Sequence, residues 1–249
     1  MRISEDHPRY RSLVTRERMA EMVTEGVVSV TGLIAHGRGE AFDYLLGERT
    51  TPEAEAAEMA AAALLVLSER PIITVNGNAA ALAVKELGEL SRISDAMLEV
   101  NLFHRSDERM EKVCAFVEAG SGEQVLGRIQ DGILEGIASD RARCCRAGLM
   151  AADVVLIPLE DGDRAEAMVR VGKKIISIDL NPLSRTSQAA TVAVVDELTR
   201  ALPNISAWVG KLRKDPQEAG RVLKNFDNRK NLTSVLDRIC HDLREPSSD

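Results

Sequence analysis

The amino-acid sequence predicts an α/β fold in which a doubly wound, mostly parallel sheet carries helices on both faces. Short β-branched runs alternate with longer segments of helical periodicity, which is the order expected of a parallel sheet with covering helices. The chain has 249 residues, 45% of them hydrophobic, which is enough for one α/β domain of the larger sort or two small ones. We expect a single α/β domain over residues 1–210 and a C-terminal helical appendage over residues 211–249.

The elements are predicted from local patterns along the chain. A helix near residues 9–24 has its apolar side chains on one face, and a short apolar stretch follows at residues 27–35. Thr51 and Pro52 open the clearest helix, because threonine is a good N-cap, proline suits the first turn, and alanine-rich sequence continues to residue 67. Six strands then follow, mostly separated by helical segments, at residues 72–75, 98–102, 124–126, 154–158, 175–178 and 191–195.

The composition changes after Pro203. Residues 211–249 are rich in charge and hold few large apolar side chains before Leu232. A set of apolar residues near the end shares one helical face: Leu232, Val235, Leu236, Ile239 and Leu243. We therefore expect a last amphipathic helix that packs on the body of the protein or on a second subunit.

Charge and hydropathy exclude several kinds of partner. The 32 lysines and arginines against 39 acidic residues give a net charge of −7, so no general field holds nucleic acid or an anionic membrane surface. The longest apolar run extends only from Met59 to Leu67, far short of the roughly 20 residues that cross a bilayer. The first residues lack the pattern of a secretory signal, and the four cysteines lack CxxC spacing. We expect a cytoplasmic protein with structural cysteines.

Polar or glycine residues follow each predicted strand. Ligands of open α/β sheets bind beyond the carboxyl ends of the strands. Asn76 and Asn78 follow the first strand, and Asn101 lies at the end of the second. Taken singly, each favours an ordinary turn, because Asn, Asp and Gly are the usual turn residues. Six such strand ends on one edge of the sheet shift the balance towards a polar binding site.

A glycine-containing segment, His36-Gly37-Arg38-Gly39-Glu40, follows the apolar stretch and precedes a short helical pattern. Its backbone N–H groups and Arg38 could cradle an oxyanion at the start of that helix. A glycine turn with solvated charges explains the same residues equally well. Neither G-x-x-x-x-G-K-[ST] nor a G-x-G-x-x-G after a strand is present, which argues against a P-loop enzyme and an ordinary dehydrogenase.

Two further loops carry clustered polar groups. Glu160, Asp161 and Asp163 place three carboxylates at one turn, where they either hold a hard cation such as Mg²⁺ or are hydrated. Asp163 could instead cap the following helix. The loop after the fifth strand combines Asp179, which suits ribose hydroxyls, with Arg185, which suits phosphates. This combination favours a nucleotide.

Several long, ordered blocks of uncommon composition stand out: HPRY at residues 7–10, GLIAHGRGEAFDYL at 32–45, VNGN at 75–78, EVNLF at 99–103, ADVVLIPLEDGDR at 152–164 and DLNPLSRT at 179–186. Together they closely resemble the archaeal-type 4-phosphopantoate–β-alanine ligases, also called phosphopantothenate synthetases, over residues 7–205. The resemblance implies a Rossmann-like homodimer. It also implies that ATP is used to join 4-phosphopantoate to β-alanine, giving 4'-phosphopantothenate, AMP and pyrophosphate on the route to coenzyme A.

The resemblance also implies residue roles. Carried over by position, the ATP contacts fall on Arg16, Arg38, Asp179, Leu180, Asn181, Arg185, Thr186, Glu197 and Leu198. Helical spacing alone would make Arg16 a surface charge, and the resemblance overturns that interpretation. The family tends to carry asparagine where this chain has Glu197, so a backbone contact is expected there. Residues 128–145 and the tail after residue 212 match poorly and inherit no role.

The implied chemistry makes several of these residues catalytic. A carboxylate must attack the α-phosphorus of ATP, forming an acyl-adenylate, before an amine can displace AMP. Arg16, Arg38 and Arg185, with Mg²⁺, would stabilise the five-coordinate phosphorus and the departing pyrophosphate. His36 is the only histidine beside the expected anion loop, so it is the expected base for the β-alanine ammonium, or else it binds phosphate.

The remaining expectations concern the other substrate, the metal and competing functions. Asn76, Asn78 and Asn101 are expected to hold 4-phosphopantoate, and Glu160, Asp161 and Asp163 to hold the metal ion. A dinucleotide-dependent oxidoreductase would use the same crevice, but the missing glycine fingerprint counts against it. A non-catalytic nucleotide-sensing module would bind ATP without releasing pyrophosphate.

Overall fold

The computed structural model describes residues 4–7, 9–137 and 140–244. Six strands form one sheet in the order β3-β2-β1-β6-β7-β8, and every pairing between neighbours is parallel. Counted along the chain, this is the 3-2-1-4-5-6 order of a doubly wound Rossmann fold. The strands are β1 (Pro71–Val75), β2 (Met97–Val100), β3 (Val125–Leu126), β6 (Val154–Pro158), β7 (Lys174–Ile178) and β8 (Val192–Val194). The predicted fold class and its six strands are confirmed.

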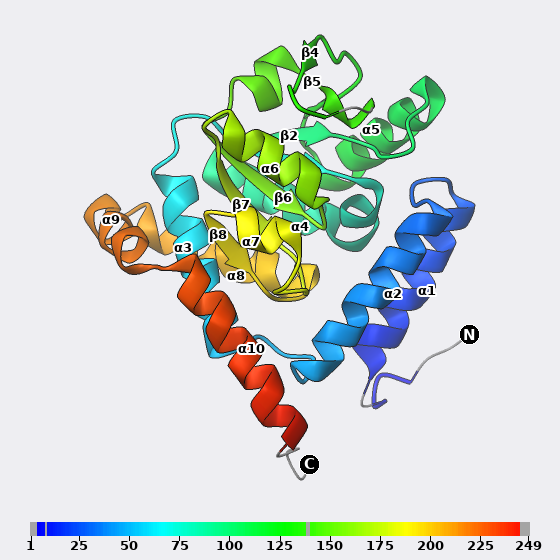
Figure 1. Ribbon diagram of the computed structural model, residues 1–249. Helices are drawn as coiled ribbons and strands as arrows, with labels where there is room; N and C mark the ends of the chain where they lie inside the picture. The colour runs from blue at the N-terminus through cyan, green and yellow to red at the C-terminus, as the bar shows by residue number, and fades with distance from the viewer. Residues whose placement is uncertain (1–3, 8, 138–139, 245–249) are drawn as a thin grey trace.

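The sheet has a hydrophobic core on each face. Ile73 of β1 lies in register with Leu98 of β2 and Leu156 of β6, and these residues belong to one core, while Ile72 belongs to the other. The first core is covered by α3 (Pro52–Val66), α4 (Gly77–Ser94), α5 (Asp107–Ser121) and α8 (Leu198–Leu212), and the second by α6 (Gly162–Arg170), a short π-helix (Arg146–Met150) and α10 (Asn228–Arg244). Figure 1 shows this arrangement of helices around the sheet. Because both faces are covered, the strands are mostly apolar, with buried polar side chains only at Thr74, Glu99 and Ser177 among the described strand residues of the sheet.

The start of α3 matches its prediction. The side chain of Thr51 caps the helix by accepting a hydrogen bond from the backbone N–H of Ala54 at 3.2 Å, and Pro52 lies in the first turn. Glu53 and Glu55 occupy the same turn, where their charge is favourable near the positive end of the helix dipole. The alanine-rich remainder lies against α8, since small side chains allow close helix packing.

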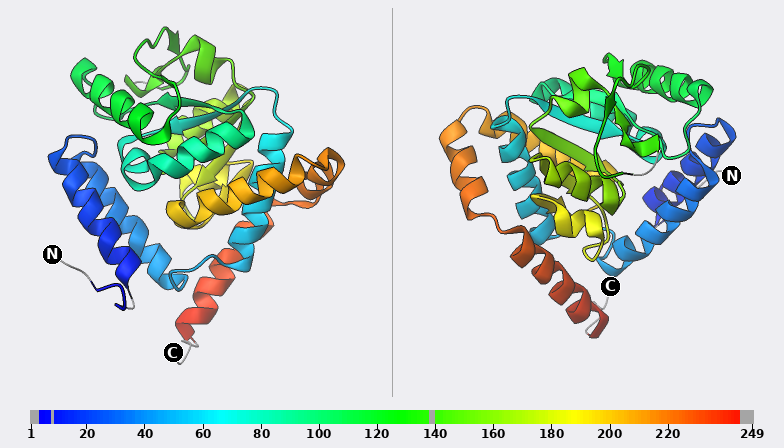
Figure 2. Two further views of the ribbon diagram at one scale, coloured as in Figure 1. Left: turned by 180° about the vertical axis from the view of Figure 1, so that it is seen from behind. Right: turned by 45° about the horizontal axis from the view of Figure 1, so that its top comes forward.

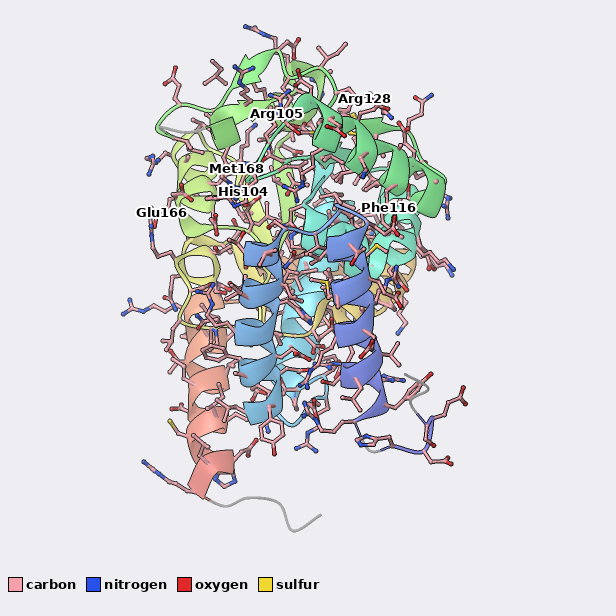
Figure 3. All side chains as sticks on the ribbon, turned by 90° about the vertical axis from the view of Figure 1, so that its right-hand side faces the viewer. His104, Arg105, Phe116, Arg128, Glu166 and Met168 are labelled. Carbon is pink, nitrogen blue, oxygen red and sulfur yellow. The ribbon has the colours of Figure 1, made fainter. Side chains whose placement is uncertain are left out.

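Two N-terminal helices, α1 (Tyr10–Thr24) and α2 (Val30–Leu45), form a hairpin. The hairpin lies along one side of the sheet and its covering helices in both views of Figure 2, and it contacts α4. The N-cap of α2 is Ser29, whose side chain accepts a hydrogen bond from Gly32 N–H. At the start of α2, Thr31 contacts the ring of His104, labelled in Figure 3, at 3.2 Å.

The expected anion loop at residues 36–40 is wrong, because this segment lies in the interior of α2. Its backbone N–H groups are inside a helix and cannot cradle an oxyanion. Each internal glycine costs a helix roughly 1 kcal/mol. The N-cap at Ser29 and the packing of α2 against α1 and α4 stabilise the helix and offset this cost. What the segment offers a ligand is therefore its side chains.

The C-terminal residues form two helices, α9 (Pro216–Asn225) and α10, and both contact α3. Leu232, Val235 and Ile239 of α10 are buried in the second core, whereas Leu243 is exposed. The tail thus packs on the body of the protein. Within the described residues, no helix is long and apolar enough to span a membrane.

A small antiparallel pair, β4 (Gly132–Ile133) and β5 (Arg143–Cys144), follows β3 and was not predicted from the sequence. A 3-10 turn (Asp140–Ala142) precedes β5, and a five-residue helix, α7 (Arg185–Ala189), follows β7. Together these elements position the loops at the carboxyl edge of the sheet.

Candidate active site

A cavity of about 590 Å³ lies beyond the carboxyl ends of β6, β7 and β8. One wall is the α1–α2 hairpin, and the opposite wall consists of the loops that follow these three strands. Figure 3 looks onto the hairpin, which stands in front of the sheet in that view. The size suits a nucleotide-sized ligand, because pockets for small molecules measure roughly 300–1,000 Å³.

Most of the residues predicted from the sequence line this cavity. They are His36, Arg38, Asn78, Glu160, Asp161, Asp179, Leu180, Asn181, Arg185, Thr186, Glu197 and Leu198. They come from α2, the start of α4 and the turns after β6, β7 and β8. Four predicted residues do not line it: Arg16, Asn76, Asn101 and Asp163.

The arginines of the cavity differ in whether their charge is already neutralised. Arg9 forms an ion pair with Glu48 at 2.8 Å, Arg185 forms one with Glu166 at 2.7 Å, and Arg200 lies between Asp43 and Asp196. Within the described residues, Arg38 and Arg11 have no hydrogen-bond or ion-pair partner. The guanidinium of Arg38 is therefore available to an anionic ligand without breaking an existing bond.

Arg16 lies at the border of the cavity. It forms an ion pair at 3.0 Å with Glu40, which does line the cavity, and the side chain of Arg16 is 45% exposed. Arg38 and Arg185 share the cavity, but the ion pair with Glu166 leaves the side chain of Arg185 65% exposed. Of the three arginines expected to converge, Arg38 is unpaired among the described residues of the cavity, Arg185 is paired with Glu166, and Arg16 is paired with Glu40 at the border.

The loop after β7 is ordered by its own polar side chains. Asp179 accepts a hydrogen bond from Asn181 N–H at 3.0 Å, and the side chain of Asn181 accepts one from Leu183 N–H at 2.9 Å. Such Asx turns fix the course of a loop. Thr186 donates to the carbonyl of Glu160 at 2.8 Å, which joins this loop to the turn after β6.

Asp179 and Glu197 are acidic groups with limited access to water. Burial raises the pKa of Asp179, while hydrogen bonds from Ser184 and Asn181 and the charge of Arg38 lower it. Burial likewise raises the pKa of Glu197, whose carboxylate accepts a hydrogen bond from Thr199 N–H at 2.8 Å as the N-cap of α8. The Glu197 side chain is thus engaged within the protein, while Asp179 lies beside the free Arg38.

His36 projects from α2 and lines the cavity. Burial lowers its pKa, and the nearby charges of Glu40 and Arg16 act in opposite directions. Its Nε2 atom is shielded from solvent and has no hydrogen-bond partner among the described residues. His36 is therefore a neutral imidazole with an unused nitrogen at neutral pH.

The expected three-carboxylate metal site is wrong. Glu160 forms ion pairs with Arg141 and, at 2.7 Å, with the fully buried Arg164, while Asp161 pairs with Arg141. Asp163 lies 3.8 Å from Arg141. In the described part of the chain, no three acidic, histidine or cysteine side chains are placed to hold a metal ion. Arg141, remote in sequence, and Arg164, one helical turn from Glu160, neutralise this acidic turn.

Two of the three asparagines expected to hold a substrate are structural. Asn76 caps α4 by accepting from Ala79 N–H, and its amide nitrogen donates at 3.0 Å to the carbonyls of Pro158 and Leu159. Asn101 is buried outside the cavity and donates to the carbonyl of Arg143 at 2.9 Å. Both expectations are corrected. Asn78 lines the cavity and also donates to the Gly32 carbonyl at 2.8 Å.

The turn after β1, where Rossmann dehydrogenases bind pyrophosphate, is filled by the chain itself. A Cβ atom on Gly77 would overlap the carbonyl oxygen of Val27 and lie 3.2 Å from the Arg109 guanidinium. A Cβ on Gly32 would overlap the side chain of Asn78. At Gly77 the turn therefore packs against the backbone of Val27, where a dinucleotide-binding fold would place the pyrophosphate.

Sequence reasoning missed Arg200, Asp43 and Arg9, all of which line the cavity. The only local signal for Arg200 is its spacing of one helical turn from Asp196. Asp43 lies 157 residues from Arg200 in the sequence, so only the folded chain reveals their contact.

The fold and the site together define a class: an α/β protein with a Rossmann-order sheet and an arginine-containing polar cavity at its carboxyl edge. Residues 53–242 match the family described as phosphopantothenate/pantothenate synthetase. The chain belongs to this family, which confirms the resemblance found in the sequence blocks.

Curated relatives agree. Proteins named 4-phosphopantoate–beta-alanine ligase are 46% identical in Methanosarcina mazei, over 99% of this chain and 98% of the relative, and 54% identical in Methanospirillum hungatei, over 86% and 87%. A relative of the same name in Thermococcus onnurineus is 44% identical over 95% of this chain and 91% of its own length. The chain is therefore similar to ligases along nearly its whole length.

Proposed function

We propose that this protein is an ATP-dependent ligase that condenses 4-phosphopantoate with β-alanine to form 4'-phosphopantothenate, AMP and pyrophosphate in coenzyme A biosynthesis. The observation that carries the proposal is the free guanidinium of Arg38 facing the same cavity as the loop after β7, in a chain that belongs to the synthetase family. The names of the relatives supply the two substrates.

The proposed reaction has two steps. A carboxylate oxygen of 4-phosphopantoate attacks the α-phosphorus of ATP, the bond to the bridging oxygen breaks, and pyrophosphate leaves. The amine of β-alanine, having lost a proton from its ammonium form, then attacks the acyl carbon, and AMP leaves with the electron pair of the broken carbon–oxygen bond. A negative charge develops on phosphate oxygens in the first step, so fixed cations in the cavity lower its barrier.

Each part of the cavity has a proposed role. Arg38 and Arg185 contact the phosphates, and Asp179 accepts from the ribose hydroxyls. Leu180, Asn181, Thr186, Glu197 and Leu198 form the surrounding nucleotide contacts. Arg16, which is paired with Glu40 at 3.0 Å at the rim, is proposed to contact ATP from there. Asn78 is proposed to contact 4-phosphopantoate.

We propose that ATP enters as its Mg²⁺ complex. Because the described residues contain no ready-made metal-ligand cluster, the ligands of the ion would be phosphate oxygens and water. None of the roles proposed for the side chains requires a protein ligand to the metal.

His36 is the proposed acceptor of the ammonium proton. Because burial lowers its pKa, His36 stays neutral, and so competent as a base, down to a lower pH than an ordinary histidine. We expect turnover of the wild type to fall only below the usual histidine range. In His36→Asn we expect a loss of about 10²-fold or more, the usual contribution of a general base. An unchanged pH–rate profile in the variant would assign His36 to phosphate binding instead.

The function itself is tested by supplying the wild-type protein with ATP, 4-phosphopantoate and β-alanine and measuring AMP and pyrophosphate. We expect both products in equal amounts over many turnovers, and neither when 4-phosphopantoate is omitted or replaced by pantoate. When β-alanine is omitted or replaced by glycine, we expect no AMP turnover and at most one pyrophosphate per protein, because the first step does not use the amine. ATP binding without pyrophosphate release would overturn the ligase proposal in favour of a nucleotide-sensing module.

We further propose that the protein forms a homodimer, as the resemblance implies. The outer face of α2 supports this proposal, because it exposes Val30, Ile34 and Tyr44 by more than 60% of their surface, and large apolar side chains gathered on one helix face favour contact with another chain.

A further inference from the structure

The side chain of Arg200 is held between two carboxylates from different parts of the fold. Its Nη2 atom donates to Asp43 at 2.5 Å and to Asp196 at 2.6 Å, and its Nε atom donates to Asp196 at 2.9 Å. A further bond joins Nη1 to Asp43 at 3.2 Å. The three side chains are only 17%, 12% and 1% exposed. These bonds therefore lie largely out of water, where they are strongest.

The two carboxylates belong to opposite walls of the cavity. Asp43 lies on α2, the helix that also presents Arg38. Asp196 lies two residues after the end of β8 and precedes Glu197 and Leu198, which begin the other wall. Arg200 thus connects the hairpin to the sheet at the level of the cavity.

Asp196 is itself anchored from several directions. Its Oδ2 atom accepts from the hydroxyl of Thr50, in the connection between α2 and α3, at 2.6 Å. Its Oδ1 atom accepts from Glu197 N–H at 2.7 Å. Because these bonds and those from Arg200 hold Asp196 to α8 and to the connection after α2, the position that Asp196 gives to Arg200 is well defined.

We infer that Arg200 is a positioning residue: with Asp43 and Asp196 it clamps α2 to the β8–α8 turn and so sets the spacing of the two walls between which the nucleotide binds. This inference rests on the proposed function. Arg200 does not act as a phosphate grip like Arg38, because two carboxylates already neutralise its charge. Catalytic geometry is sensitive to such spacing, since a displacement of about 1 Å can cost a hundredfold in rate.

The test uses Asp43→Asn, which removes a charge from the clamp but leaves Arg200 paired with Asp196. The chain offers a matched control in Glu53→Gln, which weakens the bidentate pair of Glu53 with Arg238, at 2.7 and 2.9 Å, between α3 and α10. Neither residue of the control pair lines the cavity. Both variants should lose comparable thermal stability.

We expect Asp43→Asn to raise the Kd for ATP, measured by calorimetry, about tenfold, and to raise the KM for ATP more than it lowers kcat. Amide hydrogen exchange should increase in α2 and in the β8–α8 turn. We expect Glu53→Gln to leave ATP affinity and exchange at these two segments at their wild-type values. Arg200→Lys should resemble Asp43→Asn, because lysine keeps the charge but cannot bridge both carboxylates.

The outcomes separate the clamp from the ligase proposal. ATP affinity and exchange unchanged in Asp43→Asn, or equally changed in the control, would overturn the clamp while leaving AMP formation intact. A wild type that binds ATP but forms no AMP would overturn the ligase proposal. The clamp would then be judged from the ATP affinities of Asp43→Asn and Glu53→Gln alone. A wild type that does not bind ATP would overturn both.

Discussion

Replacing Arg38 by alanine is expected to lower ATP-to-AMP turnover with 4-phosphopantoate and β-alanine about a hundredfold, because loss of one preorganised donor to a developing oxyanion costs about 3 kcal/mol of barrier. The fold should not change. Arg38 is exposed and has no hydrogen-bond or ion-pair partner within the described residues, so its removal leaves no buried group unpaired. The measurements are an AMP assay and the far-UV circular dichroism spectrum.

Arg11→Ala is the matched control for this prediction. Arg11 also lines the cavity without a partner among the described residues, but only Arg38 acts electrostatically on Asp179, the proposed ribose contact. We expect a much smaller loss of turnover in Arg11→Ala. Undiminished turnover in Arg38→Ala would refute its role, and equal losses in both variants would indicate that the cavity needs positive charge in general.

Glu58 is expected to make the free energy of unfolding fall as pH rises. Its carboxyl is fully buried, and burial together with the neighbouring Asp196 raises its pKa from 4.5 to about 8. The charged and polar groups that face it are Asp196, Asn204 of α8, which donates at 3.2 Å, and Glu55 of its own helix. Arg200 lies beyond Asp196. This environment therefore favours the protonated, neutral carboxyl group of Glu58.

The sign follows from linkage. Between pH 4.5 and about 8 the unfolded chain has released this proton and the folded protein retains it, so stability present at low pH is lost as pH rises through this window. The slope is at most about 1.4 kcal/mol per pH unit. In Glu58→Gln, which cannot ionise, we expect the slope to disappear and the variant to be more stable than the wild type at pH 9.

Urea unfolding at pH 5, 7 and 9 measures this effect, and each 1 kcal/mol corresponds to about 2–4 °C in Tm for a protein of this size. Glu55 is exposed on α3 and raises the pKa of Glu58 less than burial and Asp196 do, so Glu55→Gln is the control and should keep most of the wild-type slope. Parallel pH dependences for the wild type and Glu58→Gln would contradict the prediction.

The elements with strong local signals were predictable from the sequence. The β-branched runs gave six strands, and the threonine and proline at residues 51–52 gave the start of α3. The interior of α2 was not predictable in this way, because Gly37 and Gly39 are typical of a loop, whereas the N-cap at Ser29 and packing against α1 and α4 stabilise the helix.

The residues of the site likewise divide into those with a local sequence signal and those that depend on long-range contacts. Segments such as the loop after β7 carried their chemistry in adjacent residues, so Asp179 and Arg185 were identified directly and both line the cavity. The acidic turn at Glu160 was misassigned because one of its two arginine partners, Arg141, lies 19 residues away in a segment without a recognisable pattern. Long-range pairs of this kind decide whether a charge is free to bind a ligand.

Gly77 shows that a glycine after the first strand of a Rossmann-order sheet can serve the packing of the chain rather than a cofactor. It occupies the position where a dinucleotide-binding enzyme needs a residue without a side chain, yet the space it leaves is taken by the carbonyl of Val27 rather than by a cofactor. The two halves of the sheet therefore differ in what lies beyond their strand ends. The turn after β1 packs against the N-terminal hairpin, and the proposed nucleotide contacts lie on the turns after β7 and β8, so transplanting a redox cofactor into this scaffold would first require removing the hairpin.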